Sequence, residues 1–449
     1  MLDPQLYTIR LASPSQIEAH VQASFEIDEW RNAMTWEEFQ VFYGKEHASE
    51  WAKDSGALTW VLVRRDDYDG QIYSTCITHR IKCFYKSINS KSKSKSNSNS
   101  TSNSDPNDGG IVTISNEWYY TVTTVATPIR RRGKGYAKHL IQLLHYVLLS
   151  PSDPGHPISD DIPEYPVDKW GEPPLPISED ILPKGIASVL WSDLPIKFYE
   201  NCKIGSDKRK SYGWKSRAEW NYRLTWSLNS NRDSCSSTFK DKDDDSPNLG
   251  WDPIWESDLF EIGSILSQSI KHKLENIDTY NQAILVQDPS SRGLLSFVRS
   301  RGSFLPDRLA VKPSSSTQGD IPWGLRLKKS SNSREHSGES EETIVIFALD
   351  NYQISPNLLM TYIHNLQPYH LNSLLSALDR IVSTSGIGDS KRYGEVWGLD
   401  PQSELVKKWK ECGRDVEVGV REDGDHILGV CGYVQRELDI GQSQMWSWV

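Results

Sequence analysis

TVTTVATPIRRRGKGYAKHLIQLLHYVLLS, residues 121–150, is the stretch of sequence that decides the fold. Its first residues, Thr121 to Thr127, are rich in β-branched side chains, which favour a strand. Pro128 has no amide hydrogen with which to extend a sheet, so the strand should end there and the chain should turn. Apolar residues then recur with the i, i+3, i+4, i+7 spacing of an amphipathic helix: Leu140, Ile141, Leu143, Leu144, Val147 and Leu148. The stretch therefore predicts a strand, a glycine-containing turn and a helix.

The predicted turn has the chemistry of an anion site. The first amides of a helix have no partner inside it and carry the positive end of the helix dipole, so a phosphate fits there. Gly133 and Gly135 let the backbone approach a ligand where a Cβ would intrude. Positive charge is added by the neighbouring side chains Arg130, Arg131, Arg132 and Lys134. An ordinary turn beside a solvated basic patch is the alternative that the residues leave open.

The run from Arg130 to Gly135 resembles the (Q/R)-x-x-G-x-(G/A) signature of the GCN5-related N-acetyltransferases, and Tyr136, Ala137 and an apolar helix follow it as in that family. The turn contains neither the Gly-Lys-Ser/Thr of a P-loop nor a GxGxxG fingerprint. The resemblance implies acetyl-CoA as co-substrate and no metal, with the turn amides holding the pyrophosphate and the pantetheine arm pairing with Val125 to Thr127. The implied binding residues are Val125, Thr127, Arg130, Arg131, Arg132, Gly133, Lys134, Gly135, Tyr136 and Ala137.

Composition indicates an ordinary soluble globular protein. The chain has 449 residues, of which 37% are hydrophobic and 24% charged, enough for two or three domains. A formal net charge of −10 argues against nucleic acid as the main partner. The six cysteines form no CxxC pair and no metal spacing, so reduced thiols are expected. With neither a signal-like N-terminus nor an apolar run long enough to span a membrane, we expect a cytoplasmic location and no membrane contact.

The residues before the central strand read as alternating elements. We expect a strand at Leu6 to Ala12, a helix at Pro14 to Trp30, and a second helix from a capping box at Thr35 to about Tyr43. Leu58 to Arg64 and Ile72 to Phe84 read as a hairpin. This order is the one expected of an acetyltransferase, so the predicted fold class is α/β (α+β), with a mixed, mostly antiparallel central sheet flanked by helices.

Two insertions interrupt this arrangement. Residues 86–110 are rich in serine and lysine and have almost no apolar surface, so we expect a disordered solvated loop; a phosphorylation or targeting segment is the alternative. Residues 151–183 are rich in Pro, Asp and Glu and contain Trp170 as the one large anchor. This second insertion would follow the helix and could lie over the groove.

A further strand and helix extend the resemblance. Ile186 to Trp191 reads as a strand and Ile196 to Cys202 as a short helix. In the family, a Phe-Tyr pair follows this strand and its tyrosine often serves as general acid toward the leaving thiolate, which implies that role for Tyr199. A buried aromatic under the sheet is the alternative. The glycine and aromatic residue that usually follow would be Gly213 and Trp214, after an insertion.

The attacking amine must lose a proton, usually to a carboxylate or through water. Glu117, at the head of the central strand, is the first candidate for this base, and Asp193 is a second carboxylate near the active end of the sheet. A solvated glutamate at a strand end is an equally good reading of Glu117. Direct transfer needs no nucleophilic side chain, so the lack of a Cys-His or Ser-His pair does not argue against an enzyme.

The rest of the chain should be a separate unit. We expect an acetyltransferase domain over 1–228, a polar linker over 229–250 and a C-terminal α+β domain over 251–449, with a degenerate second acetyltransferase-like half as an alternative. Within that domain, the patterns predict helices at 257–275, 356–363 and 370–383. They predict strands at 283–286, 294–298, 342–349 and 393–397.

The late GEVWGLD run, together with ASVLWSD leading into FYEN, resembles the fungal lysine N-acetyltransferase-like proteins. Members of that group are associated with acetylating the side-chain amine of free L-lysine in lysine catabolism. The resemblance implies an acetyl-CoA-dependent N-acetyltransferase acting by direct attack on L-lysine or a related small amine, with an oxyanion forming near the Val125 amide. Two alternatives remain, namely acetylation of protein lysines or N-termini, and a non-catalytic acetyl-CoA-binding interaction protein.

Overall fold

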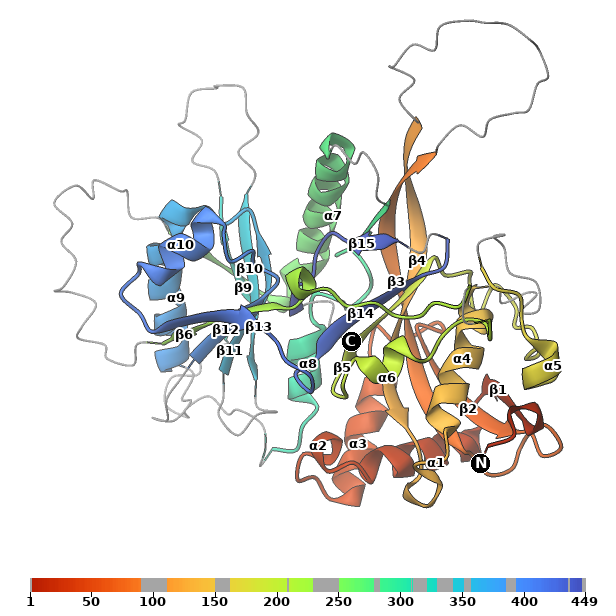
Figure 1. Ribbon diagram of the computed structural model, residues 1–449. Coiled ribbons are helices and arrows are strands. Elements are labelled where there is room, and N and C mark those ends of the chain that lie inside the picture. The colour runs from red at the N-terminus through yellow and green to blue at the C-terminus, as the bar shows by residue number, and fades with distance from the viewer. Residues whose placement is uncertain are drawn as a thin grey trace, which may run out of the picture.

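Two β-sheets with helices between and around them make up the protein (Figure 1). The computed structural model describes residues 2–89, 111–149, 162–207, 210–228, 250–277, 283–307, 309, 321–328, 342–350, 357–384, 393–434 and 437–445. Most of the serine-rich insertion (90–110), the start of the proline-rich one (150–161) and most of the expected linker (229–249) lie outside these residues.

The first sheet contains the central strand. Its strands run in the order β1 (Tyr7–Leu11), β2 (Ala57–Arg64), β3 (Ser74–Asn89), β4 (Ile111–Ala126), β5 (Ala187–Ser192) and β14 (Ile427–Gly432). β3 also pairs at its far end with β8 (Ala283–Gln287), which pairs with β15 (Leu438–Ile440). The β4–β5 and β8–β15 ladders are parallel and the others are antiparallel. The expected mixed, mostly antiparallel sheet is therefore confirmed.

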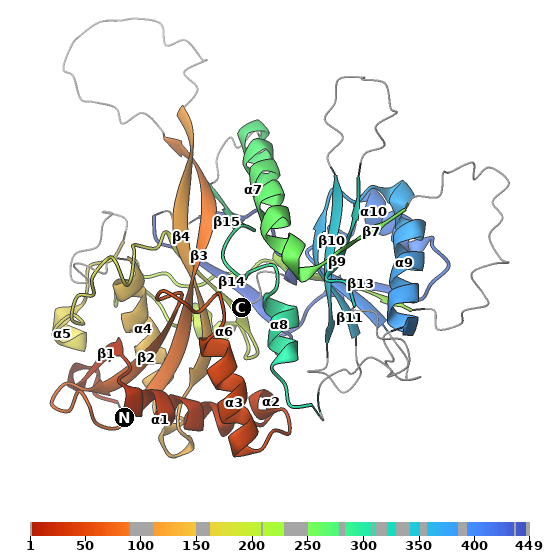
Figure 2. The ribbon, with the colours of Figure 1, turned by 180° about the vertical axis from the view of Figure 1, so that it is seen from behind.

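Helices cover both faces of this sheet (Figures 1 and 2). One face carries α4 (Tyr136–Leu149), with α5 (Val167–Trp170) and α6 (Lys197–Glu200) in the same apolar cluster. The other face carries α1 (Pro14–Phe25) and α3 (Trp36–His47), with α2 (Asp28–Arg31) between them in the chain. Three short 3-10 helices complete this part, at Pro4–Leu6, Ile129–Arg131 and Ala218–Trp220. The predicted order of strands and helices from the first strand to the helix at Lys197–Glu200 is confirmed.

Local capping explains where the first helices begin and end. The expected capping box at Thr35 is present, because Thr35 N donates to Glu38 Oε2 at 2.8 Å and Glu38 N donates to Thr35 Oγ1 at 3.3 Å. The expected helix from Pro14 to Trp30 is instead two helices, because Ile27 is extended. Near this break, Ser24 Oγ donates to the carbonyl of His20 at 3.0 Å, a back-bond that weakens the last turn.

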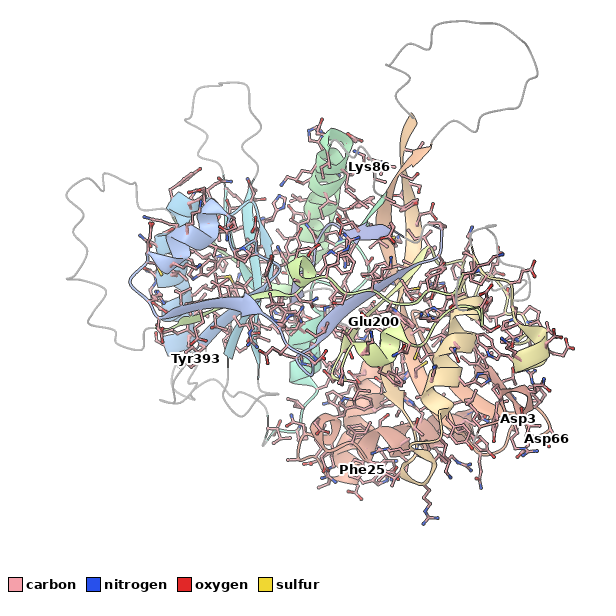
Figure 3. All side chains as sticks on the ribbon, viewed as in Figure 1. Asp3, Phe25, Asp66, Lys86, Glu200 and Tyr393 are labelled. Atoms are coloured by element: carbon pink, nitrogen blue, oxygen red, sulfur yellow. The ribbon has the colours of Figure 1, made fainter. Side chains whose placement is uncertain are left out.

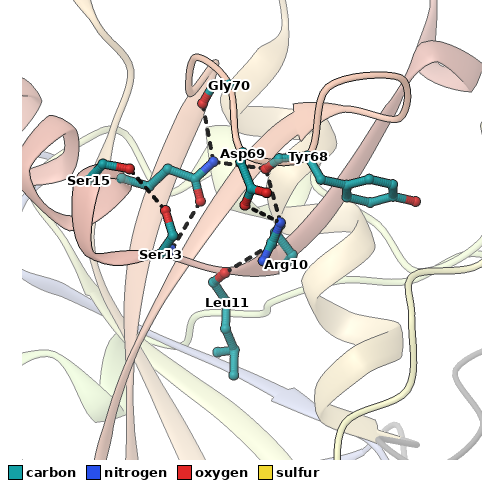
Figure 4. A network of polar contacts seen from close by, with 8 residues as sticks. Arg10, Leu11, Ser13, Ser15, Tyr68, Asp69 and Gly70 are labelled. Carbon is teal, nitrogen blue, oxygen red and sulfur yellow. Dashed lines mark hydrogen bonds and ion pairs between the residues drawn. The ribbon is translucent and has the colours of Figure 1, made fainter.

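A polar network fixes α1 to the turn between β2 and β3 (Figure 4). The Gln16 amide donates to the carbonyls of Tyr68 at 2.9 Å and Gly70 at 3.2 Å, and its oxygen accepts from Ser13 N at 3.1 Å. Arg10, on β1, donates to Asp69 Oδ1 at 2.9 Å. Because Gln16 is buried and all these groups are paired, the network holds the N-terminal helix in place against the sheet.

The second sheet is assembled from distant parts of the chain. Its strands run in the order β13 (Val416–Val420), β6 (Tyr222–Ser227), β12 (Tyr393–Trp397), β11 (Asn357–His364), β10 (Thr343–Asp350), β9 (Gly324–Leu327) and β7 (Asp252–Ile254). One face packs against α9 (Leu371–Thr384) and α10 (Glu404–Lys410). α7 (Leu259–Asn276) and α8 (Phe297–Ser303) lie between the two sheets, and short 3-10 helices occur at Glu256–Asp258 and Pro368–His370 (Figure 2).

The two sheets do not divide at the expected domain boundary near residue 228. β6, placed in the acetyltransferase domain by sequence, lies in the second sheet, whereas β8, β14 and β15 lie in the first. Lys86, labelled in Figure 3, adds a further tie: it is buried on β3 and its Nζ donates to the carbonyls of Leu274 and Ile277 at the end of α7, both at 2.5 Å. The chain therefore crosses between the sheets more than once.

Two elements of the C-terminal part differ from the predictions. Residues 294–298 were expected as a strand, but residues 294–296 form a turn and residues 297–298 begin α8. Residues 356–363 were expected as a helix, but they form β11, which pairs with β10 and β12 and is buried along its length from Leu358 to His364. Residues 356–363 become a strand because two distant strands pair with them, whereas residues 294–298 pair with no strand among the described residues. In both cases the tertiary contacts override the local sequence pattern. The expected elements at 257–275, 283–286, 342–349, 370–383 and 393–397 are confirmed within a few residues.

Candidate functional site

The central strand loses one neighbour before it ends. The parallel ladder between β4 and β5 stops at the pair Thr121 and Val189. From Val122 to Ala126, β4 keeps β3 on one edge and has no strand on the other among the described residues. The β3–β4 ladder is also irregular here, with a register shift opposite Thr75 to Ile77 and a positive φ of 53° at Thr124. An edge of unpaired backbone groups at a bulge is a place where an extended ligand can add like a strand.

The turn after this edge has the conformation that only glycine adopts without strain. The chain passes through the short 3-10 helix Ile129–Arg131, and Gly133 and Gly135 then have φ of 73° and 90° before α4 begins at Tyr136. A Cβ at Gly133 would meet no protein atom within 4 Å, and one at Gly135 only Leu2 Cδ2 at 4.0 Å. The backbone at the start of α4 therefore faces open space, and its first amides fit a phosphate group.

The basic side chains of the turn partly brace its shape. Arg132 Nε donates to the carbonyl of Thr127 at 3.0 Å, and Lys134 Nζ donates to that of Arg130 at 3.3 Å. Arg131 donates to Gln71 Oε1 and its guanidinium lies 3.8 Å from the ring centroid of Tyr73. These contacts leave the cationic groups on the surface of the turn, where they add positive potential for an anion.

Tyr136 and Ala137, the first residues of α4, are half-buried beside this turn. The Tyr136 hydroxyl lies 3.4 Å from the Tyr7 hydroxyl, and its ring centroid lies 5.1 Å from that of Tyr73. These tyrosines therefore position the start of α4 against β1 and against the residue that precedes β3.

Tyr199 lies in the apolar cluster under α4. It is 8% exposed, and its ring contacts those of Phe198 and Trp214, with centroids 5.0 and 6.0 Å away. Gly213 allows this packing, because a Cβ there would come within 3.2 Å of the carbonyl of Glu200 at the end of α6. Burial, with smaller contributions from the charges of Cys202 and Asp193, raises the pKa of Tyr199 well above its usual 10. The phenol therefore keeps its proton at neutral pH and has one to donate.

Of the two predicted carboxylates, Glu117 lies far from the open edge of β4 and Asp193 follows directly after the end of β5. Glu117 lies opposite Cys83 on β3 and lines a cavity of about 420 Å³ together with Lys271 and Asp288. It is eight positions before Val125, which is roughly 26 Å along a strand. Asp193 is half-exposed and forms an ion pair with Nδ1 of His426.

A second group of residues, which the sequence did not single out, lies on the opposite face of the bulge. It lines a cavity of about 30 Å³ that also includes Thr123 and Thr124 of β4: Glu46, His47, Ala52, Ala57, Ile77, His79, Phe297 and Arg301. Glu46 Oε1 accepts from Arg301 Nε at 2.5 Å. The β3–β4 register places His79 opposite Thr121 and Ile77 opposite Thr123, and so brings residues of the two strands into one site. No local sequence pattern predicts this register.

The described residues hold no group of three or more His, Cys, Asp or Glu side chains arranged to bind a metal ion. The same residues include no helix long and apolar enough to cross a membrane. All five cysteines in the described part of the chain are free thiols.

The protein resembles several solved structures in its backbone fold, at low sequence identity. No known protein-family profile matches the sequence, and no curated protein matches it. A GCN5-related N-acetyltransferase from Anabaena variabilis is similar, with 10% identity, a TM-score of 0.45, and coverage of 95% of this chain and 73% of that one. A conserved protein of unknown function from Enterococcus faecalis, a probable N-acyltransferase, has 9% identity and a TM-score of 0.42, with coverage of 95% and 72%.

A GNAT family acetyltransferase from Brucella melitensis, in complex with acetyl-CoA, is similar over 31% of this chain and 65% of that one, with 16% identity and a TM-score of 0.16. At these identities and TM-scores, the function must be inferred from the geometry of the site.

Proposed function

We propose that the protein is an acetyl-CoA-dependent N-acetyltransferase that transfers acetyl to an amine by direct attack. One observation carries the proposal: the edge of β4 from Val122 to Ala126, which has no neighbouring strand among the described residues, leads directly into a turn with two positive-φ glycines at the start of α4. An extended amide-containing arm suits the first feature, and a pyrophosphate suits the second. The β4 edge comes before the turn in the chain, just as the pantetheine arm comes before the pyrophosphate when acetyl-CoA is followed from its acetyl group.

The proposed roles follow this geometry. The backbone of Val125 and Thr127 would pair with the pantetheine arm, and the amides from Gly133 to Ala137 would hold the pyrophosphate beside the cations of Arg130 to Lys134. The amide of Val125 would stabilise the oxyanion that forms on the acetyl carbonyl. Tyr199 would give its proton to the departing thiolate, since the buried phenol is protonated at neutral pH.

The acceptor that we propose is the side-chain amine of free L-lysine or a related small amine. The small cavity at the β4 bulge supports a slender group rather than a bulky one, since about 30 Å³ holds about two or three water-sized groups. The net charge of −10 favours a cationic substrate over an anionic one. The resemblance to the fungal lysine N-acetyltransferase-like proteins suggests lysine itself.

Release of free CoA thiol from acetyl-CoA by the purified protein tests the proposal. The panel of acceptors should contain L-lysine, L-ornithine, L-arginine, a diamine and a lysine-containing peptide. Release with L-lysine and formation of its side-chain acetyl derivative are the expected result. Release with the peptide alone would move the assignment to protein acetylation, and acetyl-CoA binding without release would leave an acetyl-CoA-binding interaction protein.

A further inference from the structure

Three histidines from different elements converge on one face of the first sheet, below the β4 bulge. His20 comes from α1, His47 is the last residue of α3 and His79 lies on β3. The ring centroid of Tyr43 lies 5.4 Å from that of His20 and 4.4 Å from that of His47. His47 and His79 both line the small cavity that reaches Thr123 and Thr124. Two of the three imidazoles, those of His47 and His79, therefore line the cavity beside the point at which β4 changes register.

This cavity lies on the face of the sheet opposite Tyr199. Ile77 lines the cavity, whereas the preceding residue, Cys76, belongs to the apolar cluster that contains Tyr199. Successive side chains of a strand point to opposite faces, so the two groups approach β4 from opposite sides. A cavity and a phenol on opposite sides of the acetyl-binding edge suit an attacking amine on one side and a leaving thiolate on the other.

The second part of the chain closes the cavity. Phe297 and Arg301, one helical turn apart on α8, form one wall, and Arg301 pairs with Glu46 of α3. The Arg301 guanidinium also lies 5.8 Å from the ring centroid of Phe42. Because Glu46 and Arg301 offset each other's charge, the cavity is near neutral and its histidines are the groups able to accept a proton.

The three histidines differ in how well they can do so. Burial lowers the pKa of His20 and of His79 to about 3 each, which makes both very weak bases. The Nδ1 of His20 is also held at 2.9 Å from Thr75 Oγ1. His47 is only half-buried, and burial lowers its pKa below the usual 6.5 without the large shift of the other two. At neutral pH His47 is therefore uncharged and is the strongest base of the three.

We propose that this cavity is the acceptor-amine site and that His47 is the general base that takes a proton from the bound ammonium, with α8 of the C-terminal part supplying one wall of the site. The proposal rests on the acetyltransferase function proposed above. It replaces Glu117, which lies far along β4, as the candidate base. It also gives the C-terminal part a direct place in substrate recognition, through Phe297 and Arg301.

The proton and bond changes balance as follows. His47 takes one proton from the ammonium, and the nitrogen lone pair attacks the thioester carbon, forming the C–N bond. The C–S bond then breaks, and Tyr199 gives its proton to the departing thiolate. The second nitrogen proton leaves to solvent, from which Tyr199 recovers its own, and His47 releases the first. One ammonium and one thioester thus become one amide, one thiol and one free proton.

The dependence of kcat/KM on pH tests the role of His47, with L-lysine as the probe. In the natural protein, His47 deprotonates the bound ammonium, so kcat/KM should be nearly flat from pH 6.5 to 8.5 and fall at lower pH as His47 becomes charged. In His47→Gln the amine must arrive already neutral, and its pKa is about 10.4. The kcat/KM of the variant should therefore fall about 10²–10⁴-fold at pH 7 and rise about tenfold per pH unit.

Controls distinguish this role from a structural one. His272→Gln, an exposed change on α7, should leave both the rate and its pH profile unchanged. Free imidazole should restore part of the turnover of His47→Ala, which a purely structural defect would not allow. Phe297→Ala should raise the KM for L-lysine and leave the Kd of acetyl-CoA unchanged.

The possible results test the role of His47, the acceptor site and the acetyltransferase function separately. A flat profile in His47→Gln, with normal turnover, would overturn the role of His47 while leaving the acetyltransferase function intact. Binding of acetyl-CoA without transfer to L-lysine or to any other amine of the panel would overturn the acceptor site. Failure to bind acetyl-CoA at all would overturn the proposed function itself.

Discussion

Replacing Gly133 with alanine separates the shape of the turn from its role in holding acetyl-CoA. Gly133 has a φ of 73°, a left-handed conformation that costs a non-glycine residue about 1–2 kcal/mol. A Cβ at this position would meet no protein atom within 4 Å, so packing adds nothing to that cost. The free energy of unfolding should therefore fall by about 1–2 kcal/mol, measured by urea denaturation.

The affinity for acetyl-CoA should respond more specifically. The added methyl group occupies the open space in front of the turn amides, where the pyrophosphate would lie. We expect the Kd for acetyl-CoA, measured by titration calorimetry, to rise at least about tenfold, or about 1.4 kcal/mol. Gly413→Ala is the matched control, because Gly413 has a φ of 76° and is exposed beside α10, far from the turn in the chain. Equal Kd values for the two variants would refute the assigned turn.

Three further predictions concern single side chains. Tyr199→Phe should lower turnover about 10²–10⁴-fold with an unchanged Kd for acetyl-CoA, and steady-state rates equal to those of the natural protein would remove the phenol from the mechanism. Tyr433→Phe leaves the buried His145 without the hydroxyl 3.0 Å from its Nδ1, and should lower the free energy of unfolding by about 1–3 kcal/mol in urea titrations. Arg414→Met removes the guanidinium that lies 2.6 Å from the buried Asp379 carboxylate, so the protein should lose about 3–5 kcal/mol of stability; a thermal midpoint equal to that of the natural protein would contradict the importance of this pair.

Local sequence signals were enough to predict the strand, turn and helix around Gly133. Pro128 ends the strand, the glycines set the turn, and the apolar spacing of α4 survives because that helix is buried along most of its length. The capping box at Thr35 was visible for the same reason, since its two hydrogen bonds join residues only three positions apart. Features fixed by near neighbours in the chain can be read from the chain.

Features fixed by distant partners could not be predicted. β11 reads as helical in isolation, but β10 and β12 hold it as a strand. β8, β14 and β15 complete the ends of the first sheet, and in the chain each of them comes after strands that belong to the second sheet. No pattern near residue 228 indicates that the next strand of the first sheet lies more than fifty residues later.

The candidate site likewise contains one part fixed by neighbouring residues and one part fixed by residues distant in the chain. The turn residues are consecutive, so their grouping was apparent, whereas the cavity at the bulge is built from α3, β2, β3, β4, α8 and the segment before β2. His47 and His79 each look like an ordinary helix or strand residue until the register of β3 and β4 is known. Glu117 was attractive because it lies on the central strand, but position along that strand, and not membership of it, decides which residues reach the open edge.

Hydrogen exchange of the backbone amides, with and without acetyl-CoA, tests the central claim most directly. If acetyl-CoA lies along the edge of β4 and on the turn, amides in 122–127 and 133–137 should exchange more slowly when it is present, while those of β10 and β11 should not change. Slower exchange confined to other segments, or no change at saturating acetyl-CoA, would contradict the proposed site.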